Sequence, residues 1–442
     1  MQNQIIYDKK FFEKDELLTC FVLFFGLQPY IGLPSLFPTD IQPLCLIFSV
    51  IYILKKRIFY LTPINIVITC SLLFFAVLST FLCIFTSEPA TIKEIIRRIL
   101  PLYSAAIYFF TFSNILCIDN ISRILKKTIF IFIIIWFIGL LLNIFTGDNV
   151  TSLLVNRSEF SQVGYVKKRY VSFFAEPSRI PEQCYFIFLF IYSMKDNYKK
   201  IYYIGIISTL IIICLSSGSG QILFALLSLF PFLLLISIEW IKNLLFYKLN
   251  NFKLYILFLF SGIAVFSFNY LENSRGGNFL RSFFGVGRSA LMIDEGIKIK
   301  LSGFMFVIAR LFVPEIFFLS PVDPWYVLEK ELILYSRYED VCRFFTSYEI
   351  CPQTYSVYTS LGSYIVYFGY LGAFLILVFY LICFYRIINS FKITIFDRTI
   401  WLSLLFSFIM TSLVKIPLSN PSIFLSLALF LNFQTFKLKL NK

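Results

Sequence analysis

Histidine is absent from the 442 residues of this chain. Its absence removes the usual imidazole general base and most zinc sites. Charged residues are also scarce, at 14% of the chain, compared with roughly 25% in a soluble domain. The net charge of +14 is spread along the chain in small groups. No basic domain is therefore present that could bind nucleic acid.

Apolar residues, in contrast, make up 59% of the chain, and aromatic residues make up 20%. Several apolar runs approach or exceed the roughly 20 residues that an α-helix needs to cross a bilayer. A water-soluble fold could not bury this much Phe, Ile and Leu. The composition predicts an all-α polytopic membrane protein that forms one integral-membrane domain over residues 1–442.

Hydropathy divides the chain into twelve predicted spans, most of them joined by short turns. These spans cover residues 17–34, 38–54, 60–85, 97–117, 128–145, 182–194, 201–216, 221–240, 254–270, 364–385, 399–415 and 419–435. Two long loops interrupt the pattern, at about 147–181 and 271–353. Residues 303–318 of the second loop are also apolar, but Arg310, Pro314 and Glu315 argue against a thirteenth span. We predict a helix there that lies at the outer interface or re-enters the membrane partway.

Positive charge predicts the orientation of the spans, because loops rich in Lys and Arg stay in the cytoplasm. With the N-terminus inside, each of the seven inside segments carries three Lys or Arg, whereas the short outside turns carry four in total. The other 14 lie in the two long loops, and long loops are translocated largely regardless of charge. Both termini are therefore predicted to be cytoplasmic, and both long loops are predicted to face outward.

The first long loop gathers charged residues just before a predicted span. Arg169 and Arg179 flank Glu176, with prolines at positions 177 and 181. One interpretation is an anion site in which the arginines bind phosphate oxygens in forked pairs, while Glu176 acts as a base or orients an arginine. The other is a capped helix start beside a basic run that binds lipid head groups. Composition alone favours the second interpretation.

The second long loop contains three regularly spaced arginines. Arg275, Arg281 and Arg288 recur at intervals of six and seven residues. If this part is partly helical, Arg281 and Arg288 share one face. We predict that the loop forms a partly helical cap whose arginines bind an anionic ligand, although arginines at a membrane surface would give the same pattern.

A family resemblance adds to this interpretation. An arginine followed seven residues later by the glutamate of an F-x-E-P-S element, in an outer loop before a span, resembles Wzy-type O-antigen polymerases. These belong to a larger group of lipid-linked glycan polymerases and ligases. The matching residues are Arg169, Phe174, Glu176, Pro177 and Ser178. The two long outer loops with arginines match the family's layout, and the stretch with Gly362, Gly369 and Gly372 resembles the helix that follows its second loop.

The resemblance implies a glycosyltransferase in the bacterial inner membrane, with periplasmic long loops. It would move the growing O-antigen from undecaprenyl pyrophosphate onto the next lipid-linked repeat unit, with lipid-linked oligosaccharides as donor and acceptor and a chain-length regulator as partner. Without histidine or a dense carboxylate cluster, we expect no metal and no cofactor. The predicted catalytic residues are Glu176, Arg169 and Arg288, and the predicted pyrophosphate-binding residues are Arg179, Arg281 and Arg275.

Three other functions remain open. A flippase or exporter of the same lipid-linked unit would also have many spans, but it should place polar and charged groups deep within them. An O-antigen ligase is a second alternative, although related ligases carry a histidine near the end of the second loop, and this chain has none. A non-catalytic scaffold is the third.

Overall fold

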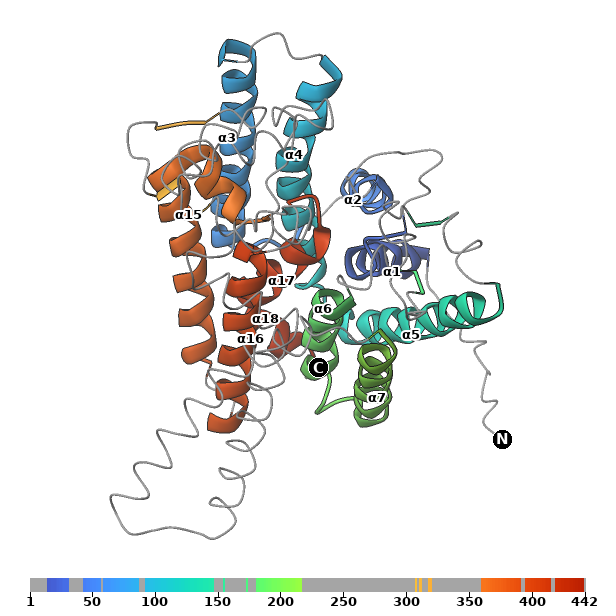
Figure 1. The fold of residues 1–442 in the computed structure, drawn as a ribbon. Helices are drawn as coiled ribbons and strands as arrows, with labels where there is room; N and C mark the ends of the chain where they lie inside the picture. Colours follow the sequence, from blue (N-terminus) through green and yellow to red (C-terminus); the bar gives the residue numbers. More distant parts are fainter. Residues whose placement is uncertain are drawn as a thin grey trace, which may run out of the picture.

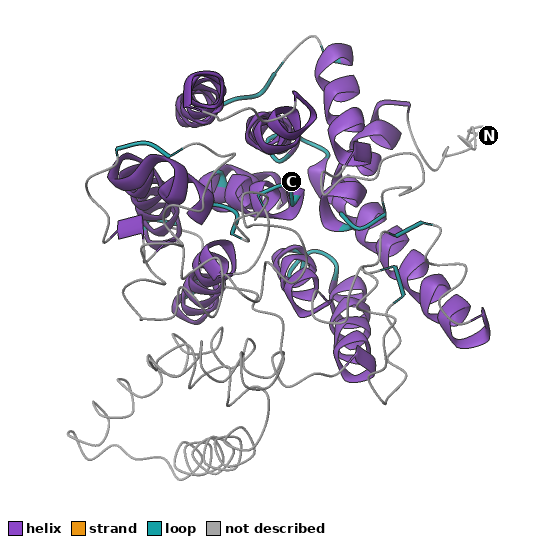
Figure 2. Ribbon diagram, turned by 45° about the horizontal axis from the view of Figure 1, so that its top comes forward, coloured by secondary structure: helices purple, strands orange, loops and turns teal. Residues whose placement is uncertain are grey.

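The computed structural model describes residues 14–31, 43–56, 59–86, 92–146, 154–155, 172–173, 180–216, 307, 310–311, 317–319, 359–390, 394–414 and 418–440. Regular structure in this part of the chain is helical, and no strand occurs in it (Figure 1, Figure 2). An isolated antiparallel bridge joins Ile31 to Val155 of the first long loop. The predicted all-α class is confirmed for the described residues.

The helices follow the apolar segments of the sequence. They are α1 (Lys14–Leu27), α2 (Pro43–Lys55), α3 (Pro63–Thr86), α4 (Ile92–Ile115), α5 (Ile121–Thr146), α6 (Ile180–Ser193), α7 (Lys199–Ser216), α15 (Gly362–Ile388), α16 (Ile395–Val414), α17 (Pro421–Leu431) and α18 (Phe433–Leu440).

Prolines and capping side chains mark several helix starts. α2, α3 and α17 each begin at a proline, whose fixed φ suits a first helical position. Asn420 caps α17, because its Oδ1 accepts a hydrogen bond from the backbone N–H of Ser422 at 2.9 Å. Before α16, Thr394 Oγ1 accepts from the backbone N–H of Asp397 at 3.1 Å and donates to the Asp397 carboxylate at 3.0 Å. The Thr394 side chain therefore caps the start of α16.

Four described helices are long and apolar enough to cross a membrane, namely Pro63–Phe85, Ile121–Thr146, Gly362–Ile388 and Phe396–Leu413. A fifth candidate arises if α17 and α18, bent by 83°, are counted as one span. α1, α2 and α6 have 14, 13 and 14 residues, or about 20 Å at 1.5 Å per residue. The described part is thus typical of an α-helical membrane protein. The count of twelve stays a prediction, and spans 221–240 and 254–270 lie outside the described residues.

Two predicted spans differ from the helices in a way that matters for the site. The sequence predicted unbroken spans at 364–385 and 419–435, but both are interrupted. α15 contains Gly369 with φ +55° and ψ −131°, a conformation that interrupts the helix. α17 ends at Leu431, and the chain turns at Asn432 into α18. The first predicted span also ends early as a helix, at Leu27.

α17 lies at the centre of the described bundle. All eleven of its residues are buried. It contacts α1, α4, α6, α15 and α16, which surround it in Figure 1. A helix that is apolar on every side belongs in the interior of a bundle, so α17 is the element against which the others are positioned.

Candidate functional site

The side chains predicted to act lie outside the described residues. They are Arg169, Glu176, Arg179, Arg275, Arg281 and Arg288. The structure instead describes how the first long loop is held on both sides of Glu176, and the helix into which the second long loop leads.

The upstream flank is fixed at Ser172 and Phe173, both of them buried. Ser172 Oγ donates to the carbonyl of Trp136 in α5 at 2.9 Å, and Gln28 Nε2 donates to the carbonyl of Phe173 at 2.8 Å. Gly139 permits this approach, since a Cβ there would overlap Ser172 Oγ and lie 2.6 Å from the Phe173 ring. The loop is therefore anchored immediately before the F-x-E-P-S element.

The downstream flank is fixed at Gln183 in the first turn of α6. This side chain is fully buried. Its Nε2 donates to the carbonyl of Leu27 and, at 3.0 Å, to Ser422 Oγ at the start of α17. Ser422 Oγ in turn donates to the carbonyl of Gly26 at 2.6 Å. Neutral side chains thus hold the start of α6 against the C-terminal end of α1.

The two flanks are tied to neighbouring residues. Gln28 holds the upstream flank and the carbonyl of Leu27 holds the downstream flank, so both attach to the end of α1. We call Gln28, Ser172, Phe173, Gln183 and Ser422 the anchor group. No motif in the sequence predicts this group, although polar residues at the edges of apolar segments are a visible signal.

The helix that follows the second long loop is broken near its start. The φ and ψ of Gly369 fall in a region that glycine alone adopts readily. A Cβ at Gly372 would overlap the carbonyl oxygen of Tyr364, so the first two turns of α15 fold back onto the next turn. The glycines quoted for the family resemblance are the residues that make this break possible.

The break frees backbone carbonyls, and residues of the second long loop bind two of them. In a continuous helix each carbonyl accepts from the N–H four residues later. Here Val366 O accepts from Arg310 Nε at 3.1 Å, and Tyr367 O accepts from the backbone N–H of Leu319 at 2.7 Å. Arg310 belongs to the apolar segment 303–318, and Leu319 directly follows this segment. Within a membrane such donors are required, because an unsatisfied carbonyl costs several kcal/mol.

Arg310 is the buried cation of this region, with only 2% of its surface exposed. A Cβ at Gly369 would lie 2.8 Å from Arg310 Nη2, so the guanidinium fills the space beside the glycine. In the sequence, Arg310 argued only against a thirteenth span. An arginine in an apolar segment is by itself a signal of a functional site. The positive charge of Arg310 lies beside the N-terminal end of the straight part of α15. A helix N-terminus also attracts anions, so the guanidinium and the helix end together favour an anionic group at this place.

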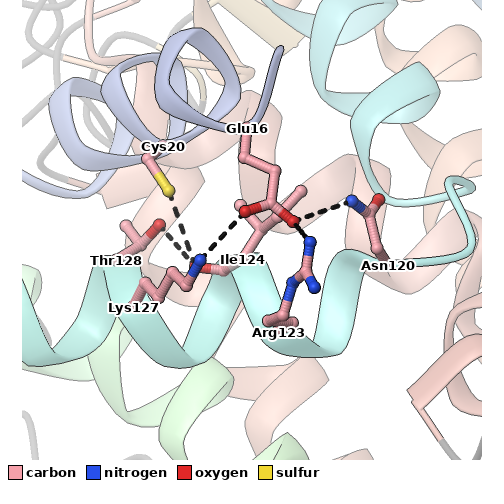
Figure 3. Close-up of polar contacts among 7 residues, drawn as sticks. All are labelled: Glu16, Cys20, Asn120, Arg123, Ile124, Lys127 and Thr128. Atoms are coloured by element: carbon pink, nitrogen blue, oxygen red, sulfur yellow. Dashed lines mark hydrogen bonds and ion pairs between the residues drawn. The ribbon is translucent and has the colours of Figure 1, made fainter. Parts of the chain in front are cut away.

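Charged side chains gather at the ends of α1 and α6 that lie opposite the anchor group. Glu16 of α1 is 2% exposed. Its carboxylate contacts Arg123, accepts from Lys127 Nζ at 2.9 Å and accepts from Asn120 Nδ2 at 3.2 Å, all at the start of α5 (Figure 3). Burial opposes ionisation of Glu16, but the hydrogen bonds and charges of Lys127 and Arg123 outweigh it. The pKa of Glu16 therefore lies below its usual value of 4.5.

Two further ion pairs connect the turn after α6 to α16 and connect α18 to the segment before α5. Lys195, in the turn after α6, pairs with Asp397 of α16, and Lys439 of α18 pairs with Asp119 before α5. We call Glu16, Asp119, Arg123, Lys127, Lys195, Asp397 and Lys439 the charged cluster. Each of these helices contributes to the charged cluster at the end that the charge count assigns to the cytoplasm. The anchor group uses the opposite ends of α1 and α6, together with the start of α17.

Comparison of the chain with protein-family models, with curated proteins and with solved structures finds no match.

Proposed function

We propose that this protein is an O-antigen polymerase of the bacterial inner membrane. It transfers a growing glycan from undecaprenyl pyrophosphate onto the next lipid-linked repeat unit. The observation that carries the proposal is the anchoring of both flanks of the F-x-E-P-S element to the end of α1. Three peptide units span at most about 11 Å, so anchoring at Phe173 limits where a carboxylate at position 176 can act.

The proposed chemistry needs no metal or cofactor. The sugar C1 of the donor already carries a pyrophosphate leaving group. A hydroxyl oxygen of the acceptor attacks C1, the bond from C1 to the pyrophosphate oxygen breaks, and the hydroxyl proton passes to Glu176. Arg169 and Arg288 neutralise charge that develops on the leaving group, while Arg179, Arg275 and Arg281 bind the pyrophosphates.

The sorting of polar contacts in the bundle supports outward-facing loops. The charged cluster collects groups from segments assigned to the cytoplasm, and the anchor group collects residues at the opposite helix ends. With both termini cytoplasmic, the first long loop, the break in α15 and Arg310 belong to the periplasmic side. This is the side on which an outer-leaflet lipid pyrophosphate would present its sugar.

The alternatives fit the described residues less well. A flippase should carry charged groups deep within its spans, yet in the described part only Glu16 and Arg310 are buried charged side chains. Glu16 lies in the first turn of α1, and Arg310 lies at the break of α15. A ligase is disfavoured by the absence of histidine, and a scaffold would have no need for arginines around a glutamate whose flanking segments are anchored.

Deletion of the gene, followed by gel electrophoresis of the surface polysaccharide, separates these functions. Loss of a polymerase leaves single repeat units on lipid A, and this is the expected result. Loss of a flippase leaves almost no repeat units, and loss of a ligase leaves polymer that is not attached to lipid A. Either of these outcomes would overturn the proposal, as would an unchanged ladder.

A point variant tests the arginine clamp within the same assay. Lys keeps the positive charge of Arg169 but loses the planar fork that binds two phosphate oxygens. Arg169→Lys and Arg288→Lys should therefore shorten the polymer at unchanged protein level. Normal polymer length in both variants would contradict the clamp.

A further inference from the structure

An open apolar groove runs along the second half of α15, beside the start of α3. Its volume is about 490 Å³, and Val378, Leu381, Ile382 and Tyr385 line it on α15 together with Ile64 of α3. α3 and α15 touch further along, where the ring centroids of Phe75 and Phe368 lie 4.4 Å apart. Leu381 and Tyr385 are 57% and 63% exposed. In a membrane these side chains face acyl chains, not water.

A guanidinium lies at one end of this groove. Arg386 belongs to the last turn of α15 and lines the groove. Its Nη1 donates to Gln434 Oε1 of α18 at 3.3 Å, and Gln434 Nε2 donates to the carbonyl of Asn389 at 3.2 Å. The amide is therefore fixed with its oxygen toward Arg386. Gln434 is neutral, so it positions the guanidinium without cancelling its charge.

The charge of Arg386 sets it apart from the charged cluster. Arg123, Lys127, Lys195 and Lys439 each face a carboxylate. Among the residues that the structure describes, Arg386 forms no ion pair. A basic residue in the last turn of a helix interacts favourably with the helix dipole. This interaction explains why a cation stands at position 386, but it does not explain why the cation lies at the end of an apolar groove.

We propose that this groove binds an anionic phospholipid of the surrounding bilayer. One acyl chain lies along Val378, Leu381 and Ile382, and the phosphate accepts hydrogen bonds from Arg386. Basic pockets between helices at the cytoplasmic face recognise anionic head groups in this way. The exposed Tyr385 ring precedes Arg386, as expected of an aromatic side chain that lies near lipid head groups. The groove uses the end of α15 opposite the broken turn, so this inference does not depend on the proposed function.

The test places a tryptophan in the groove and measures its quenching by brominated lipid. The Tyr385→Trp variant is reconstituted in vesicles that contain brominated phosphatidylglycerol or brominated phosphatidylcholine. Fluorescence is compared with that of the parent chain, which has four tryptophans. Phe384→Trp is the matched control, because Phe384 precedes Tyr385 on the same helix, is 48% exposed and does not line the groove.

We expect phosphatidylglycerol to quench the reporter at position 385 at about fivefold lower mole fraction than phosphatidylcholine, because one basic residue near an anionic head group contributes about 1 kcal/mol. Adding Arg386→Gln should abolish this preference, whereas Lys55→Gln, which removes an exposed charge from the end of α2, should keep it. Equal quenching by the two lipids overturns the proposal. So does the same preference at position 384, or an equal loss with Lys55→Gln.

Discussion

The charged cluster and the anchor group hold opposite ends of α1 and α6 by different chemistry. In the charged cluster, carboxylates face ammonium and guanidinium groups, as Glu16 faces Lys127 at 2.9 Å. In the anchor group, neutral amides and hydroxyls bind backbone carbonyls, as Gln28 binds Phe173 at 2.8 Å. Carbonyls at helix C-termini need donors, and neutral side chains supply them without adding charge. The contacts described at the two flanks of the first long loop are therefore made by neutral groups.

The largest expected effect is on activity, at Glu176. As a general base it contributes roughly 10²–10⁴-fold to the rate, so Glu176→Gln should lose that factor while lipid-linked substrate still binds. If Glu176 only orients an arginine, Gln keeps much of the hydrogen bonding and the loss is far smaller. Polymerisation by purified protein in lipid vesicles measures the rate, with Glu182→Gln as the neighbouring control. Normal polymerisation by both Glu176→Gln and Glu176→Ala would reduce Glu176 to a helix cap.

The break of α15 should be the position most sensitive to added volume. In Gly372→Ala the new methyl group overlaps the backbone carbonyl of Tyr364, which no side-chain rotation can relieve. We expect a loss of about 3 kcal/mol in the free energy of unfolding. Leu371→Met, at an exposed position beside Gly372, should change it by less than about 0.5 kcal/mol. Unfolding in detergent, followed by circular dichroism, compares the two. Equal stability would mean that the first turns of α15 do not fold back.

Breaking the anchor group should reduce both stability and activity. Gln183→Leu removes a donor from Leu27 O and from Ser422 Oγ in a fully buried site. Leaving buried acceptors unpaired costs about 1–3 kcal/mol. Because the same side chain fixes the chain after Glu176, the polymerisation rate at a temperature where the protein stays folded should fall as well. Loss of stability with an unchanged rate would separate the anchor from the catalytic loop.

In the charged cluster, Glu16→Gln should affect stability and its pH dependence but not catalysis. We expect a loss of about 1–2 kcal/mol at neutral pH, since two cations lose a buried carboxylate, although Arg123 is half exposed and therefore partly screened. The folded-state pKa of Glu16 is lowered, so its contribution is fully present above the usual value of 4.5 and is lost as pH falls through the folded value. As the pH is lowered from about 7 to 3, the melting temperature should fall less steeply in the variant than in the parent chain. Parallel curves would contradict this assignment.

The smallest expected effect is at Asp119. Its side chain is 71% exposed in the pair with Lys439, and exposed ion pairs contribute about 0–1 kcal/mol. Asp119→Asn should therefore shift the melting temperature by much less than Glu16→Gln in the same buffer. A shift as large as that of Glu16→Gln would show that burial does not distinguish the two pairs.

Residues far apart in the sequence explain what sequence analysis missed. Apolar runs predicted where most described helices lie, because burial in lipid or in a bundle depends on composition along a single segment. The prolines at the starts of α2, α3 and α17 are local signals of the same kind. The anchor group could not be predicted, because Gln28 and Phe173 lie 145 positions apart and Gln183 and Ser422 lie 239 apart.

The order of residues alone indicates an α-helical membrane protein in which Glu176 stands among arginines beside a predicted span. It also suggested which helix ends share a side, because charge avoids the membrane interior. The three-dimensional packing was needed to show that both flanks of Glu176 attach to the end of α1, and that α15 breaks at Gly369. The physical reason is that a break frees carbonyls whose new donors, such as Arg310, come from another segment of the chain. Such partners are chosen by packing and not by neighbours in the sequence.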